Sequence, residues 1–142
     1  MMVDVQTLDA RRKTLGTVKI QSFTQLTTWQ KGHSLVLDMY RATDQFPPGE
    51  QFALTSQIRR AVVSFTSNIA EGFSRGSAKD KQHFYSMALS SLTEVQNQLL
   101  IARDLGYITH EQFSGLADRS VEIVKMTKGL MKKTTMSRPP HV

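Results

Sequence analysis

The sequence has no cysteine, which excludes disulfide bonds, thiolate zinc sites and cysteine nucleophiles. It has no apolar run near the roughly 18 to 20 residues that span a membrane, and its first twenty residues form no signal-type apolar core. It also lacks a phosphate-binding loop and the H-E-x-x-H motif of metalloproteases. We therefore expect a soluble, cytoplasmic protein without enzymatic activity and without a membrane partner.

The length limits the number of domains, and the net charge indicates the class of partner. A chain of 142 residues with 39% apolar residues can bury one core, so one domain is expected. The 18 Lys and Arg residues outnumber the 12 Asp and Glu residues and give a net charge of +6. This balance favours polyanionic partners such as nucleic acid.

Apolar residues recur at steps of three and four in four segments, which is the spacing of one face of an α-helix. The first segment runs from Thr24 to about Phe46, where Pro47 and Pro48 stop it. We expect the second helix to end at Gly72 in a left-handed cap. The predicted inner faces are Leu26, Trp29, His33, Val36, Tyr40 and Thr43; Leu54, Ile58, Ala61, Val62, Phe65 and Ile69; Phe84, Ala88, Ser91, Val95, Leu99 and Ala102; and Phe113, Leu116, Ser120, Ile123, Thr127 and Leu130.

Capping residues mark the remaining helix ends. Ser77 with Asp80 and Thr109 with Gln112 have the spacing of capping boxes, so they predict the starts of the third and fourth helices. Gly106 closes the third helix. Because short loops force consecutive helices to run antiparallel, the fold predicted is all-α, an antiparallel up-down-up-down four-helix bundle. We place the bundle at residues 23–134, a weakly ordered tail at residues 1–22 and a C-terminal tail at residues 135–142, which should be extended from Ser137 to Val142.

This topology brings the start of the first helix, the loop between the second and third helices and the end of the fourth to one end of the bundle. The starting turn of the third helix offers free backbone donors to an anion at this end, so one interpretation is a phosphate-binding face. The other interpretation is that Lys128, Lys132 and Lys133 complement the negative end of the fourth helix and keep the protein soluble. We call the basic residues gathered there the basic pole: Arg75, Lys79, Lys81, Lys125, Lys128, Lys132 and Lys133.

The second helix has few charged residues. A helix whose outer face has almost no charge is usually covered by neighbouring helices or by another subunit, so we expect a homo-oligomer. The alternative is that the small outer residues Val63, Thr66 and Ala70 tolerate exposure. At 100° per residue a narrow polar stripe lies beside the apolar face and consists of Gln57, Arg60, Ser64, Asn68 and Glu71.

Three segments together resemble one bacterial family. They are QIRRAVVSFTSNIAEG from Gln57 to Gly72, SLTEVQNQLLIARDLGYI from Ser91 to Ile108, and an FxxLxxWQ opening from Phe23. The chain resembles, over about Phe23 to Lys133, the four-helix bundle proteins encoded in intervening sequences of 23S ribosomal RNA genes. This resemblance implies a ring-like homopentamer without known enzymatic activity. A related branch, the accessory proteins of diversity-generating retroelements, uses a basic pentamer of this fold to bind a reverse transcriptase and nucleic acid.

Four polar residues match recurrent polar positions of that family: Arg60, Asn68, Glu71 and Glu94. A carboxylate near a helix C-terminus opposes the helix dipole, so Glu71 is expected to have a cationic or donor partner. We interpret these residues as a polar network at a helix or subunit contact, because partly buried charges are normally paired. The alternative is a ligand site.

Candidate metal ligands are isolated. His33 lies in the apolar stripe of the first helix, where a hydrogen-bonded core histidine is expected. Asp80 and His83 form one D-x-x-H pair, whereas a di-iron bundle needs two such pairs and two further inward carboxylates. We predict no metal and no cofactor. The main functional hypothesis is a homo-oligomeric module that binds RNA or an RNA-bound protein through the basic pole; the alternative is a structural oligomer or protein-interaction adaptor that binds no nucleic acid.

Overall fold

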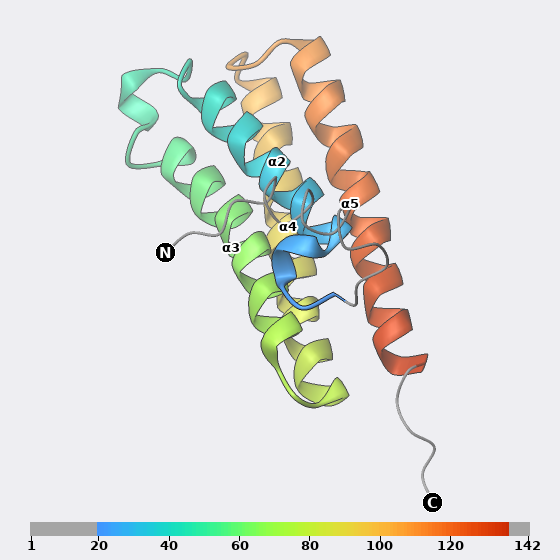
Figure 1. Ribbon diagram of the computed structural model, residues 1–142. Helices are drawn as coiled ribbons and strands as arrows, with labels where there is room; N and C mark the ends of the chain where they lie inside the picture. Colours follow the sequence, from blue (N-terminus) through green and yellow to red (C-terminus); the bar gives the residue numbers. More distant parts are fainter. Residues whose placement is uncertain (1–19, 137–142) are drawn as a thin grey trace, which may run out of the picture.

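The computed structural model describes residues 20–136, which form an antiparallel bundle of four α-helices (Figure 1). Each helix packs against its neighbours in the chain, and α5 also packs against α2, which closes the bundle. The predicted all-α four-helix bundle is confirmed, and no strand occurs within residues 20–136. The elements are η1 (Phe23–Gln25), α2 (Thr27–Thr43), η2 (Pro48–Glu50), α3 (Leu54–Ser74), α4 (Ala78–Asp104) and α5 (His110–Met136).

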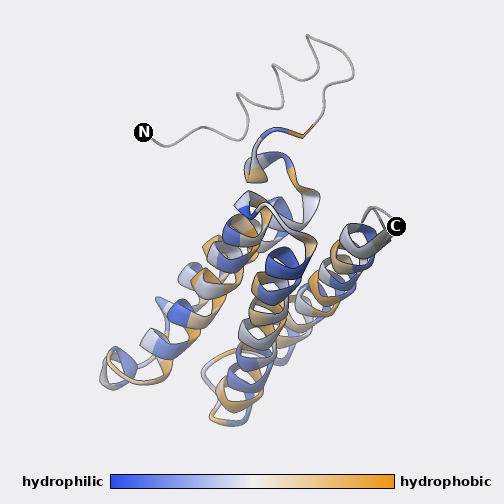
Figure 2. Ribbon diagram, turned by 90° about the horizontal axis from the view of Figure 1, so that it is seen from below, coloured by the Kyte–Doolittle hydropathy of each residue, from blue (hydrophilic) through white to orange (hydrophobic). Residues whose placement is uncertain are grey.

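The predicted tails fall mostly on residues 1–19 and 137–142, which lie outside the described residues. Hydrophobic and hydrophilic residues alternate along each helix (Figure 2), as expected of helices with one buried face. None of the described helices is long and apolar enough to cross a membrane. The predicted inner face of α3 is buried throughout, and the inner faces of α4 and α5 are buried except for the half-buried Phe84, Phe113 and Leu130.

The first helix begins later than predicted. Ser22 and Gln25 form a capping box around the 3₁₀ turn η1, and Leu26 then adopts an extended conformation with φ −73° and ψ 126°. The predicted start at Thr24 is therefore wrong, and the α-helix begins at Thr27. It also ends at residue 43, three residues before the predicted end, because the chain turns ahead of its two prolines.

The buried face of α2 is rotated relative to the prediction, because its centre is a glycine. A Cβ atom on Gly32 would lie 2.4 Å from Cε2 of Phe65 and 3.2 Å from Cγ2 of Thr66, both on α3. The missing side chain lets α2 approach α3 closely, and Thr66 is buried there, not exposed as predicted. This rotation leaves four predicted core positions outside the core. Trp29, His33 and Val36 are half-buried, and Tyr40 is exposed.

A second glycine brings α3 close to α4. The predicted left-handed cap at Gly72 is wrong, because α3 continues to Ser74 and Gly72 is buried within the helix. A Cβ atom on Gly72 would lie 2.5 Å from Cε1 of Tyr85. This glycine is therefore required for the close approach of an aromatic ring and not for a turn.

The predicted helix starts are confirmed by their hydrogen bonds. Ser77 Oγ accepts from the Asp80 amide at 3.1 Å at the start of α4. At the start of α5 the Thr109 amide donates to Gln112 Oε1 at 2.8 Å, and the Gln112 amide donates to Thr109 Oγ1 at 3.0 Å. The second pair is a complete capping box, so α5 satisfies its first amides with its own side chains.

The end of α4 is a glycine cap, as predicted. Gly106 has φ 77°, and its amide donates to the Arg103 carbonyl at 3.0 Å. The Tyr107 amide donates to the Ala102 carbonyl at 2.9 Å. These two bonds form a Schellman motif, which needs a residue in the left-handed conformation and so favours glycine.

The glycine contacts generate a stability prediction. Gly72→Ala should lower the free energy of unfolding by about 1–3 kcal/mol, because the buried Tyr85 ring would have to move. Gly115→Ala is the control, because a Cβ atom there meets nothing within 4 Å, and it should raise stability by about 0.5–1 kcal/mol through helix propensity. Urea unfolding followed by circular dichroism measures both. Equal changes in the two variants would contradict the close approach of α3 and α4.

Candidate functional site

The α3–α4 turn and the C-terminal end of α5 lie at one end of the bundle, at the bottom of Figure 1. The start of α2 does not reach this end, because α2 has 17 residues whereas α4 and α5 have 27 each. In Figure 1, η1 lies part-way along the bundle. The prediction that the first helix also starts at this end is therefore wrong, and the basic pole is built from the α3–α4 turn and α5.

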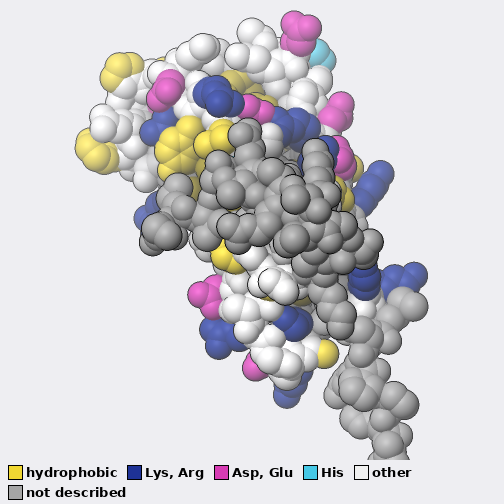
Figure 3. Space-filling view, in the orientation of Figure 1, with side chains coloured by type: hydrophobic (Ala, Val, Ile, Leu, Met, Phe, Trp, Pro, Cys, Tyr) yellow, Lys and Arg dark blue, Asp and Glu magenta, His cyan; other side chains and the backbone are white. Residues whose placement is uncertain are grey.

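Gln82 joins the two parts of the basic pole. Its Nε2 donates to the Met131 carbonyl at 2.6 Å and to the Thr135 hydroxyl at 2.5 Å. The first turns of α4 are thereby fixed against the last turns of α5. Figure 3 shows Lys and Arg side chains around the α3–α4 turn and along the lower part of α5.

Lys81 has a structural partner and is not free to bind phosphate. Its Nζ donates to the carbonyls of Gly72 at 3.2 Å and Phe73 at 2.6 Å, in the last turn of α3. Burial lowers the pKa of this ammonium group below its ordinary value. A cation bonded to the last carbonyls of a helix satisfies groups that have no partner within the helix. Lys81 therefore caps α3.

Five lysines of the basic pole are exposed, and none has a hydrogen bond or ion pair with another residue within the described chain. Three of them follow one another on α5 at steps of three and four, so they line one face over about 10 Å at 1.5 Å per residue. Ammonium groups without carboxylate partners are available to phosphate groups. The five are Lys79, Lys125, Lys128, Lys132 and Lys133.

Arg60 and Glu94 of the predicted polar network lie together. Both line a shallow pocket of about 450 Å³ between α3 and α4, with Gln57, Ala61 and Ser64. Both side chains belong to exposed residues, and neither has an ion pair or hydrogen bond to any residue in the range 20–136. The pocket thus presents one cation and one anion that are not satisfied by the surrounding chain.

The other two members of the network have local partners. Asn68 Nδ2 donates to the Ser64 carbonyl at 2.9 Å, and Glu71 Oε2 pairs with Arg75 Nη2 at 3.2 Å. The expected cationic partner of Glu71 is therefore Arg75. Arg60 and Glu71 are separated by about 16 Å along α3 at 1.5 Å per residue, so they do not meet within one chain. A network that joins them needs a second chain or another molecule.

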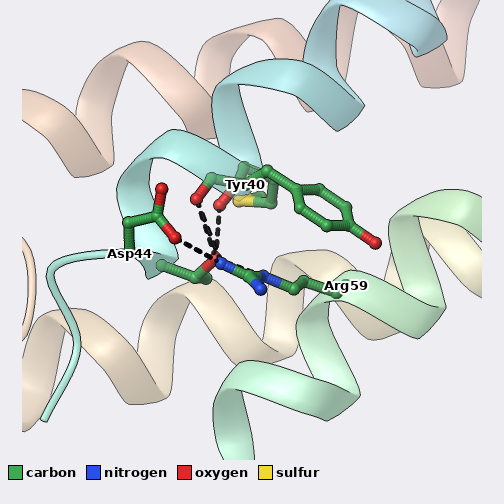
Figure 4. A network of polar contacts seen from close by, with 5 residues as sticks. Tyr40, Asp44 and Arg59 are labelled. Atoms are coloured by element: carbon green, nitrogen blue, oxygen red, sulfur yellow. Dashed lines mark hydrogen bonds and ion pairs between the residues drawn. The ribbon is translucent and has the colours of Figure 1, made fainter. Parts of the chain in front are cut away.

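Arg59 joins α3 to the C-terminal end of α2 (Figure 4), a contact that no sequence pattern predicted. Its Nε donates to Thr43 Oγ1 at 2.9 Å, and its Nη2 donates to Asp44 Oδ1 at 2.9 Å and to the Tyr40 carbonyl at 3.3 Å. The guanidinium carbon lies 4.5 Å from the centroid of the Tyr40 ring. These partners are far from Arg59 in sequence, so no local pattern marks them.

An exposed aromatic residue near this contact was also missed. Phe52 is 91% exposed, and with Tyr40 and Val63 it lines a pocket of about 420 Å³ on the α2 and α3 side. Figure 3 shows apolar side chains at the upper left, over the α2–α3 loop. A large exposed apolar surface commonly marks an interaction site.

The isolated histidines lie apart from one another. His33 is half-buried and stacks on Trp29 with 4.7 Å between ring centroids, in place of the predicted hydrogen bond. Asp80 and His83 are both exposed. Across residues 20–136 no group of three His, Asp, Glu or Cys residues is placed to hold a metal ion.

Comparisons with known proteins agree with this fold. Residues 24–129 match the profile of the family described as 23S rRNA-intervening sequence protein. A crystal structure of a protein with unknown function from the S23 ribosomal protein family of Bacteroides thetaiotaomicron is similar, with a TM-score of 0.68 and 24% identity. The match covers 75% of this chain and 99% of that one. No curated protein matches the chain.

The Arg59 contact generates the second prediction. Arg59→Ala should lower the free energy of unfolding by about 1–3 kcal/mol, because it removes charge-assisted hydrogen bonds between α2 and α3. The control is Arg41→Ala, which removes a largely exposed pair with Asp38 and should cost less than about 1 kcal/mol. Urea unfolding of both variants provides the comparison, and a loss for Arg41→Ala as large as that for Arg59→Ala would contradict the assignment.

Proposed function

The chain belongs to the 23S rRNA-intervening sequence protein family, and we propose that it is a homo-oligomeric, non-enzymatic module that binds RNA, or a protein bound to RNA, through the basic pole. The family resemblance implies five copies in the oligomer. We place the protein in the cytoplasm, because a chain without cysteine suits a reducing compartment.

The observation that carries the RNA proposal is the set of five exposed lysines without carboxylate partners in the described chain. Net charge alone would not favour one surface over another. These lysines occupy two segments, the start of α4 and the second half of α5, that Gln82 holds together. Each lysine that contacts a phosphate releases a counterion, so the affinity should fall as salt rises.

The support for a homo-oligomer comes from the outer face of α3 and α4. Glu94 is the one charged residue among the exposed positions of α4 from Ser86 to Ile101. On α3 the exposed residues between Gln57 and Ser67 include one charge, Arg60. The exposed face of α5, by contrast, is rich in charged residues. A face this poor in charge is typical of a surface covered by another chain.

Oligomerisation would also strengthen binding to RNA. Copies arranged in one ring with parallel bundles would present their basic poles on the same side. Several weak phosphate contacts would then act together on one RNA, because the first contact raises the effective concentration of the next. The alternative function is a structural oligomer or adaptor, in which the α5 lysines serve only to complement the negative end of that helix.

The third prediction separates these two functions. Lys128→Gln combined with Lys132→Gln should weaken binding of a labelled structured RNA and reduce the slope of log affinity against log salt by about two. The control combines Gln45→Glu with Arg41→Gln, which lowers the net charge by the same amount away from the basic pole and from the exposed face of α3 and α4. Fluorescence anisotropy at low and physiological salt measures the affinity, and light scattering on the same samples measures the oligomer.

The control variant should bind RNA nearly as well as the unaltered protein. A defined oligomer that binds no RNA even at low salt would support the structural or adaptor function instead. Equal weakening in the two double variants would show that the overall charge and not the basic pole determines binding.

A further inference from the structure

We infer that neighbouring copies of this chain contact each other through two different apolar surfaces, with Phe52 of one copy packing against Ile101 and Leu105 of the next. The inference rests on the proposed homo-oligomer and assigns its contact. The first surface, the Phe52 surface, consists of Phe52, Tyr40 and Val63 around their pocket. The second, the α4 surface, consists of Ile101 and Leu105.

Both surfaces expose apolar side chains that the bundle itself does not cover. Phe52 is 91% exposed, and the residues of the α4 surface are 41% exposed at Ile101 and 55% exposed at Leu105. The residues of the Phe52 surface come from α2, α3 and the loop between them, whereas the α4 surface lies at the end of a different helix. One chain therefore has two apolar patches that differ in shape and position.

The two surfaces lie at the same level along the bundle. The hydroxyl groups of Ser64 and Ser91 are 2.8 Å apart, and this contact fixes the register of the antiparallel pair α3 and α4. Counting outward from it places Leu54 level with Ile101. Phe52 lies in the turn directly before α3 and precedes Leu54 by two residues, so it lies close to the level of Ile101 and Leu105.

A ring of parallel bundles requires that the two contacting surfaces lie at the same height along the bundle. A rotation about an axis parallel to the bundle leaves the height of every residue unchanged, so residues that meet between copies must lie at the same height. Two different patches give a head-to-tail contact, which generates a ring when the rotation closes. A symmetric dimer would instead need one self-complementary patch.

Two charged residues, Arg60 on α3 and Glu94 on α4, favour a second copy of the chain over another kind of partner. From the same register, Arg60 lies level with the residue next to Glu94. Neither side chain is paired within residues 20–136. An identical copy supplies the opposite charge at the required height, so Arg60 of one copy lies opposite Glu94 of the next. A nucleic acid would be repelled by Glu94 and would leave the α4 surface exposed to water.

The absence of cysteine in the natural sequence makes the contact directly testable. Two variants of the full chain with different tags, Phe52→Cys and Ile101→Cys, are co-expressed and mildly oxidised. We expect a disulfide-linked heterodimer on a non-reducing gel, and no linked product when either variant is expressed alone. The control replaces Ile101→Cys by Val121→Cys, an exposed apolar position on α5, and should give no heterodimer.

Light scattering on the same samples distinguishes failure of this contact from failure of the proposed oligomer. An oligomer without the heterodimer would overturn the assigned contact and leave the proposed oligomer intact. Linked homodimers of Phe52→Cys alone would show a symmetric contact and overturn the head-to-tail arrangement. A monomeric protein would overturn both, and protection of the Phe52→Cys thiol by RNA in that monomer would assign Phe52 to nucleic acid.

Discussion

The structure depends on two glycines that allow aromatic rings to lie against neighbouring helices. Phe65 on α3 occupies the space beside Gly32 of α2, and Tyr85 on α4 occupies the space beside Gly72 of α3. Both rings are almost fully buried, so neither can move aside at low cost when a side chain is added. These contacts hold α3 against both α2 and α4 and fix how α4 lies along it.

The register of α3 and α4 determines which residues face water. It brings the small and polar residues of both helices to one outer face, where the charged Arg60 and Glu94 share a pocket. The exposed face of α5 is instead rich in charged residues, which continue along the helix to the basic pole. One helix pair is thus suited to contact another chain, whereas α5 and the α3–α4 turn are suited to contact a polyanion.

Much of the fold could be predicted because α3, α4 and α5 carry regular apolar patterns and local capping residues such as Ser77 and Thr109. The buried face of α2 could not, because its central residue is Gly32, which has no apolar side chain to reveal the face. Lys81 was predicted to bind nucleic acid at the basic pole, but its ammonium group bonds to the carbonyls of α3, and these bonds depend on three-dimensional contacts. The exposure of Phe52 was missed for the same reason, since no local pattern separates it from the buried Phe46.

The proposed function requires RNA to contact the five exposed lysines that have no partner within residues 20–136. The most direct measurement is the rate of acetylation of each lysine with and without a structured RNA at low salt, read by mass spectrometry. We expect slower acetylation when RNA is bound at Lys79, Lys125, Lys128, Lys132 and Lys133. The rate at Lys31, which pairs with Glu122 on the side of the bundle, should be unchanged. Unchanged rates at those five lysines in a sample that binds RNA would contradict it.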